Sequence, residues 1–344
     1  MNLKKLIFLI LALLIVIGGF LGFSYYSKIL KPNTVKEGYL YIPTSATFEE
    51  VEDLARPFLK RVKPFIWVAK KKNYSNTIKA GKYKIEKGWN NNELVNLLRS
   101  GKQEPVKITF NNQDSFEKLA GRISNQIEAD SISLLKAFKD AEFYSKHNFN
   151  TKTALGMYIP NTYEFYWNTD ALKFRSKMQI EFEKFWNTSR IQKAKAQNLS
   201  KNEVITLASI VQKETSSVGE RPMVAKLYLN RLQDKWPLQA DPTIIFALKE
   251  KNGKDFEVKR VLKKDLEINS RYNTYKYAGL PPGPIAMPDI SSIDAVLNPA
   301  NHNYYYMCAS VTKIGLHEFA KSLSQHNRNA SKYQNWLNSQ GVLR

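Results

Sequence analysis

Glu214 is the residue of this chain whose type and position best fit acid–base chemistry. It ends one helical pattern, and Glu220 and Arg221 open the next. Carbonyl dipoles at the end of a helix disfavour an anion, and partial burial also raises a carboxyl pKa. A carboxylic acid that stays protonated near neutral pH can serve as a general acid. The alternative is an ordinary surface glutamate near a helix end, and spacing alone leaves both interpretations open.

The other reactive residue types do not indicate a competing site. Cys308 is the only cysteine, so an intrachain disulfide is impossible, and its apolar run at 304–309 predicts a buried strand with a structural thiol. The four histidines have no metal-ligand spacing, so we expect no metal. Because the chain has neither G-x-x-x-x-G-K nor G-x-G-x-x-G, we expect no nucleotide and no other cofactor.

Two predicted helices position Glu214. Ser200 and Glu203 have the spacing of a capping box at the start of the first helix. Apolar residues then recur at helical spacing up to Val211, which predicts a buried face. The run at 216–219 interrupts the pattern, and Pro222 suits the first turn of the second helix. The carboxyl group of Glu214 is therefore expected at the corner between two packed helices.

Six short motifs surround this corner in a fixed order. They are LASIVQKET at 207–215, ER at 220–221, YLNRL at 228–232, LQADPT at 238–243, YNTY at 272–275 and GLPPGPI at 279–285. Together they resemble the signature of the YceG-like family of endolytic murein transglycosylases. The chain departs from that signature at Gln212, Gly156 and Asn161, where acids are usual in the family. The resemblance therefore assigns the catalytic role to Glu214.

The resemblance implies cleavage of the β-1,4 bond between N-acetylmuramic acid and N-acetylglucosamine, leaving a 1,6-anhydro end. One carboxyl group is enough for this reaction, because the C6 hydroxyl of the muramic sugar is the nucleophile. Glycan strands of peptidoglycan are the implied substrate, wall-synthesis enzymes are the implied partners, and termination of strand elongation is the implied role. Two alternatives remain: a peptidoglycan-binding scaffold with weak catalysis, and a muramidase that activates water through a second carboxylate, Glu220 or Asp241.

Polar residues near the motifs are candidates for binding sugar: Glu220, Arg221, Asn230, Gln239, Asp241, Asn273 and Tyr275. Glu220 and Arg221 have a structural alternative, an ion pair with each other at the start of the second helix. Asp241 also has one, because an aspartate before Pro242 and Thr243 suits a helix cap.

The N-terminus predicts a membrane anchor. Lys4 and Lys5 precede an uncharged apolar run at 6–23, followed by Tyr25 and Tyr26, which together approach the roughly 20 residues that span a bilayer. The alternative is a cleaved signal peptide, but no small-x-small cleavage pattern follows the run. We expect a cytoplasmic tail at 1–4, a single-pass anchor at 5–26 in the cytoplasmic membrane, a short linker, and a catalytic domain on the outer side.

We expect an α+β fold beyond the anchor. A helix at 47–59 that Pro57 interrupts, a second at 61–71, a strand at 80–85 and a helix at 91–98 resemble a LysM-like module, with bounds of 35–102. Such a module would bind glycan or act as a spacer. Residues 103–344 are assigned to a YceG-like catalytic domain. The net charge of +21 fits a solvated basic surface, anionic lipid or an acidic polymer, and no motif supports nucleic acid.

Overall fold

The computed structural model describes residues 3–253 and 255–340 and has a mixed α+β fold. The first residues of the expected cytoplasmic tail, and residues 254 and 341–344 of the expected catalytic domain, lie outside the described part. The chain forms two compact units. The first comprises Met1–Ile108, Ser124–Ala129 and Tyr163–Asp170, and the second comprises Thr109–Ile123, Asp130–Thr162 and Ala171–Arg344.

The first unit begins with a long apolar helix, α1 (Leu3–Ile29). At about 1.5 Å of rise per residue, its 27 residues can cross the roughly 30 Å hydrocarbon core of a bilayer. The mean hydropathy of its apolar window is 3.0, and the side chains of that window are exposed rather than packed inside the protein. Such a helix fits the single-pass anchor that the sequence predicts.

The residues directly after α1 are not a linker, contrary to the expectation from sequence. Asn33 is 1 % exposed, and its side-chain amide donates to the carbonyl oxygen of Arg61 at 2.8 Å and to Oδ1 of Asn91 at 2.7 Å. Asn91 in turn donates to the carbonyl oxygen of Lys28 at 2.7 Å. The end of α1 is therefore hydrogen-bonded to the module that follows it, because buried amides need partners.

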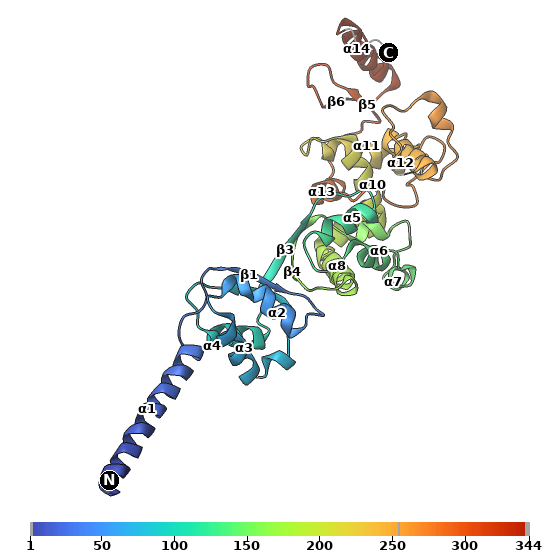
Figure 1. Cartoon of the computed structure of the whole chain (residues 1–344). Coiled ribbons are helices and arrows are strands. Elements are labelled where there is room, and N and C mark those ends of the chain that lie inside the picture. Colours follow the sequence, from blue (N-terminus) through green and yellow to red (C-terminus); the bar gives the residue numbers. More distant parts are fainter. Residues whose placement is uncertain (1–2, 254, 341–344) are drawn as a thin grey trace. The chain divides into compact units, whose positions relative to one another are not determined.

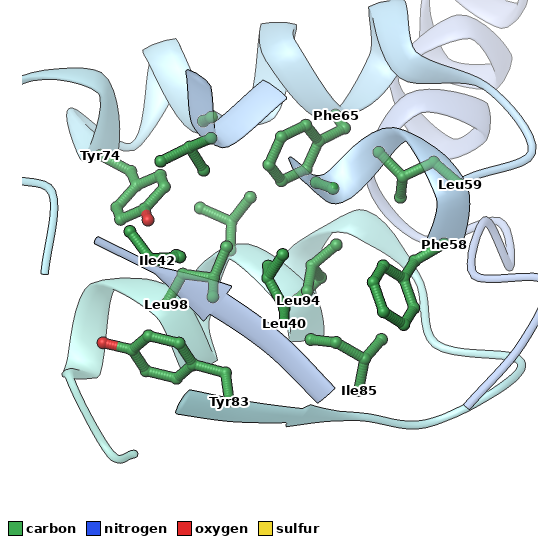
Figure 2. Packing of buried hydrophobic residues seen from close by; sticks show 14 of the residues in the cluster. Leu40, Ile42, Phe58, Leu59, Phe65, Tyr74, Tyr83, Ile85, Leu94 and Leu98 are labelled. Carbon is green, nitrogen blue, oxygen red and sulfur yellow. The ribbon is translucent and has the colours of Figure 1, made fainter. Parts of the chain in front are cut away.

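That module surrounds one apolar core, which Figure 2 shows. Strands β1 (Gly38–Ile42) and β2 (Gly81–Ile85) pair antiparallel, with Leu40 opposite Tyr83. The elements around them are α2 (Phe48–Ala55), η1 (Arg56–Phe58), α3 (Val62–Lys71), η2 (Tyr74–Asn76) and α4 (Asn91–Ser100). As predicted, the helix that begins at Thr47 is interrupted at Pro57, where the chain tightens into η1.

Strands β3 (Pro105–Phe110) and β4 (Asn161–Tyr166) pair with each other, and each runs from one unit into the other along the sequence. The helices of the second unit that precede Glu214 are α5 (Phe116–Ser124), α6 (Ser131–Phe138), α7 (Ala141–Lys146), η3 (Ala154–Met157), α8 (Ala171–Phe185), α9 (Thr188–Ala196) and α10 (Lys201–Glu214). All residues from Val204 to Val211 in α10 are buried, which makes α10 a central helix of this unit.

The elements after α10 are α11 (Arg221–Gln233), α12 (Asp241–Asn252), η4 (Lys263–Glu267), α13 (Ile290–Leu297), β5 (Tyr306–Ala309), β6 (His317–Ala320) and α14 (Leu323–Ser339) (Figure 1). Helices α11, α12 and α13 all pack on α10. The strand expected at 304–309 begins at Tyr306 and is half-buried, not buried. In the described part of the chain its sheet consists of β5 and β6, so Cys308 stays partly exposed.

Candidate active site

Glu214 is the last residue of α10, as the sequence predicts. The capping box at Ser200 and Glu203 fixes where α10 starts, and the backbone leaves the helix at Thr215, which is extended. The Tyr228 hydroxyl, from the buried face of α11, donates to Oε1 of Glu214 at 2.7 Å. The corner therefore holds the carboxyl group between two packed helices, while part of its surface stays accessible.

The surroundings of Glu214 change its acidity. Burial is the largest cause and raises its pKa from 4.5 to about 7. The hydrogen bond from Tyr228 and the nearby His317 and Arg231 oppose this rise, whereas the charge of Asp241 adds to it. Near neutral pH the group is therefore present in both protonation states. It can donate a proton and take one back, as a general acid–base catalyst must.

Arg231 is a part of this site that sequence reasoning missed. Its guanidinium donates to the carbonyl oxygens of Tyr305 at 2.8 Å and Leu238 at 2.5 Å, and burial lowers its pKa. A buried cation bound to neutral carbonyls favours negative charge nearby. The motif YLNRL contains both Tyr228 and Arg231, so the signal was present in the sequence, but helical spacing gives no partner for either residue.

Glu220 and Arg221 were expected to pair with each other or to contact sugar, but each binds a different partner. Oε2 of Glu220 lies 2.9 Å from Nδ1 of His317, and its Oε1 accepts the backbone N–H of the same residue at 2.6 Å. Arg221 donates to both carboxylate oxygens of Asp289 at 2.8 Å. These contacts join the start of α11 to β6 and to the start of α13. The side chains of Glu220 and Arg221 are buried, because the residues are only 7 % and 4 % exposed.

Asp241 and Tyr275 form a polar pair near Glu214. The Tyr275 hydroxyl donates to Oδ1 of Asp241 at 2.5 Å. The charge of Asp241 raises the pKa of Glu214, and burial, followed by Asp241 and Glu214, raises the pKa of Tyr275. The alternative of a helix cap is wrong for Asp241, because Ala240 occupies the cap position of α12 and Asp241 is the first helical residue. Asp241 is exposed and Tyr275 is half-buried, so both can reach a ligand.

The remaining three candidates differ in whether their side chains are buried in the protein or exposed to solvent. The Asn230 amide donates to the carbonyl oxygens of His302 and Tyr304 at 3.2 and 3.1 Å. Asn273 is fully buried, and its side-chain amide donates to the carbonyl oxygens of Leu266 and Ile268 at 2.8 and 2.9 Å. Gln239 is exposed, with a left-handed backbone at a φ of 51°. Of these three predicted sugar contacts, Gln239 alone has a side chain open to solvent.

The three departures from the family signature have structural roles. Gln212 Oε1 accepts the backbone N–H of Asp289 at 3.2 Å and the hydroxyl of Ser292 at 2.6 Å. A Cβ at the buried Gly156 would lie 2.6 Å from Cγ2 of Ile205 in α10, so a larger residue here displaces neighbours. Asn161 is exposed, and its Oδ1 accepts the N–H of Thr162 at 2.8 Å.

Side chains of the types that bind metals do not cluster in the part of the chain that the structure describes. No group of three or more His, Cys, Asp or Glu side chains within 3–253 and 255–340 could hold an ion. The groups that change the pKa of Glu214, besides burial, are Tyr228, His317, Asp241 and Arg231.

Comparison with known proteins places this arrangement in a family. The profile of the YceG-like family matches residues 40–332. A Bacillus subtilis protein named endolytic murein transglycosylase is 30 % identical over 93 % of this chain and 91 % of its own length. A Streptococcus pneumoniae protein of the same name is 28 % identical over 95 % of this chain, which spans 64 % of that relative.

A solved structure gives the same result for the fold. The crystal structure of a yceG-like protein from Listeria monocytogenes is 27 % identical, with a TM-score of 0.56. It covers 85 % of this chain, and 98 % of that protein takes part in the match. Because the family profile covers most of the chain, including the corner at Glu214, the chain belongs to the YceG-like family.

Proposed function

We propose that this protein is a membrane-anchored endolytic lytic transglycosylase of peptidoglycan. It cleaves the β-1,4 bond after N-acetylmuramic acid and leaves a 1,6-anhydro end, which terminates the elongation of a glycan strand. The names of the Bacillus and Streptococcus relatives support the activity. The observation that carries the mechanism is the carboxyl group of Glu214, whose pKa burial raises to about 7 at a partly accessible helix corner.

Glu214 performs both proton transfers in this mechanism. Its protonated form donates to the departing glycosidic oxygen, and its carboxylate then takes the proton of the C6 hydroxyl as that oxygen attacks the anomeric carbon. Attack within one sugar gives the high effective concentration that an external water lacks. The Tyr228 hydroxyl stabilises the carboxylate between the two steps. Asp241, Tyr275 and Gln239 are proposed to orient the sugar, because their side chains are at least partly exposed.

A hydrolytic muramidase is less well supported by the geometry. It needs a second carboxylate that activates water. Both oxygens of Glu220 are bound to N–H groups of His317, and Glu220 is 7 % exposed. Asp241 remains as a base, but its Oδ1 accepts from Tyr275.

The wall lies outside the cytoplasmic membrane, so the proposed activity puts the catalytic unit on the outer side, anchored by α1. The module at 35–102 is proposed as a LysM-like element that binds glycan or spaces the catalytic unit from the membrane. Wall-synthesis enzymes remain the proposed partners.

The test is product analysis by mass spectrometry after digestion of purified glycan strands. We expect anhydro ends from the wild type and from Glu250→Gln, a matched change at an exposed glutamate of α12. We expect none from a folded Glu214→Gln variant. Reducing ends from the wild type would establish the muramidase, and no product would establish the scaffold. Full activity of Glu214→Gln would refute the assignment of this residue.

A further inference from the structure

The segment that contains α3 carries positive charge that the proposed reaction does not use. Residues 54–85 contain ten lysines and arginines and no aspartate or glutamate. Within α3, Lys63, Trp67, Lys70 and Lys71 recur at helical spacing. These four residues, with Lys28 of α1, are called the α3 face. Phe65, Val68 and Ala69 lie in the core of the module, and Trp67 is half-buried at the edge of that core.

Helix α3 packs beside the end of α1 (Figure 1). The rings of Trp67 and Tyr25 meet edge to face, with their centroids 5.3 Å apart. Nζ of Lys28 lies 5.1 Å from the centroid of the Trp67 ring, and Nζ of Lys71 lies 6.0 Å from it. At the start of α3, Arg61 donates to the carbonyl oxygen of Ser27 at 3.1 Å. The start of α3 and Trp67 therefore lie beside residues 25–28 of α1, and Lys71 lies beside Trp67.

That level corresponds to the surface of a membrane that α1 spans. The apolar run of α1 ends at Phe23, and Tyr25 and Tyr26 follow it. Tyrosine and tryptophan concentrate where the hydrocarbon meets the head groups. Since Trp67 contacts Tyr25, Trp67 lies in the same layer. The hydrogen bond from Asn91 to the carbonyl oxygen of Lys28 also joins the module to this end of α1.

The charges of the α3 face are available for a ligand. Within the described part of the chain, Lys28, Lys63, Lys70 and Lys71 make no ion pair, and all but Lys28 are exposed. The elements that pack most extensively on α1 are α3 and α4. Their only acid is Glu93, whose carboxylate accepts the N–H of Asn90 at 2.8 Å in the capping box of α4. No acid of these elements therefore neutralises the lysines.

We propose that the α3 face binds the phosphates of anionic phospholipids in the outer leaflet of the membrane that α1 spans. The module would then be a second, peripheral membrane contact, with Trp67 in the head-group layer and lysines around it. This proposal rests on the anchoring proposed for α1 and does not depend on the enzymatic activity.

Two measurements on the full chain in lipid vesicles test the proposal. Electron paramagnetic resonance of trace spin-labelled lipids gives the preference of the protein for phosphatidylglycerol over phosphatidylcholine. A nitroxide at position 70, introduced as Lys70→Cys in a Cys308→Ser chain, reports depth, and one introduced as Lys84→Cys on β2 is the reference. Flotation with the vesicles reports insertion of α1 separately, so failed anchoring is distinguished from failed lipid binding.

A lysine near an anionic surface strengthens binding about fivefold. We therefore expect Lys28→Gln, Lys70→Gln and Lys71→Gln together to abolish the preference for phosphatidylglycerol. Lys82→Gln, Lys84→Gln and Lys102→Gln, with the same loss of charge, should leave it intact. The label at 70 should lie at phosphate depth and the label at 84 in water. Equal losses in the two triple variants, no preference in the wild type, or a label at 70 as exposed to water as the one at 84 would each overturn the proposal.

Discussion

Replacement of Tyr228 by phenylalanine should raise the pKa of Glu214. The Tyr228 hydroxyl donates to Oε1 of Glu214 at 2.7 Å, and this bond opposes the rise that burial causes. A hydrogen bond to a charged group contributes about 1.5–3 kcal/mol and one to a neutral group about 0.5–1.5 kcal/mol. The carboxylate therefore loses about 1–1.5 kcal/mol more than the neutral acid. At about 1.4 kcal/mol per pKa unit, the pKa should rise by about one unit, from about 7 to about 8.

The assay is the pH dependence of single-turnover cleavage of glycan strands. Activity that needs protonated Glu214 falls as pH rises through its pKa, so the alkaline limb should move to higher pH by about one unit in the variant. A 13C NMR titration of labelled glutamate measures the same pKa without substrate. Tyr305→Phe is the matched control, because it removes a hydroxyl that donates to Asp234 at 2.5 Å, on an exposed surface. An alkaline limb that stays in place or moves to lower pH in a folded Tyr228→Phe chain would refute the reasoning.

Two further predictions concern stability. The pKa of Glu214 is higher in the folded state than its ordinary 4.5, so stability should fall as pH rises from about 4.5 through about 7. Glu214→Gln should therefore increase the free energy of unfolding at pH 8 by up to about 3 kcal/mol and leave it unchanged at pH 4. Urea titrations at the two pH values measure both quantities. An increase of the same size at both pH values would contradict the raised pKa of Glu214 as its cause. Gly156→Ala should cost about 1–3 kcal/mol, because its Cβ would lie 2.6 Å from Cγ2 of Ile205. The same measurement on Gly121→Ala, whose Cβ meets nothing within 4 Å, should show no loss, and Ile205→Ala should relieve part of the cost at Gly156.

Local patterns in the sequence predicted the elements around the site. The capping box at Ser200, the apolar stripe of α10 and Pro222 in the first turn of α11 act within a few residues, so backbone physics determines them without the rest of the fold. The apolar run at 6–23 likewise predicted the long helix α1 from local composition alone. The expected linker after α1 was wrong because the bonds of Asn33 to Arg61 and Asn91 join residues 28 and 58 positions apart.

The partners of the site residues could not be predicted in the same way. Helical spacing assigns Tyr228 to an apolar face, but only the packing of α11 on α10 brings its hydroxyl to Glu214. The pairs of Glu220 with His317 and of Arg221 with Asp289 span 97 and 68 positions, so no local pattern contains them. For the same reason, two of the amides predicted to bind sugar, Asn230 and Asn273, proved to hold backbone carbonyls.

The sequence by itself therefore determined that a lone glutamate ends a buried helix in a chain with an apolar N-terminal helix. Tertiary structure alone decided what that glutamate can do. Its pKa depends on how much water the packed elements exclude and on the charges of Arg231 in α11, Asp241 in α12 and His317 in β6, which the fold brings close. Desolvation and Coulomb interactions act through space, so they are fixed by the folded arrangement and not by position along the chain.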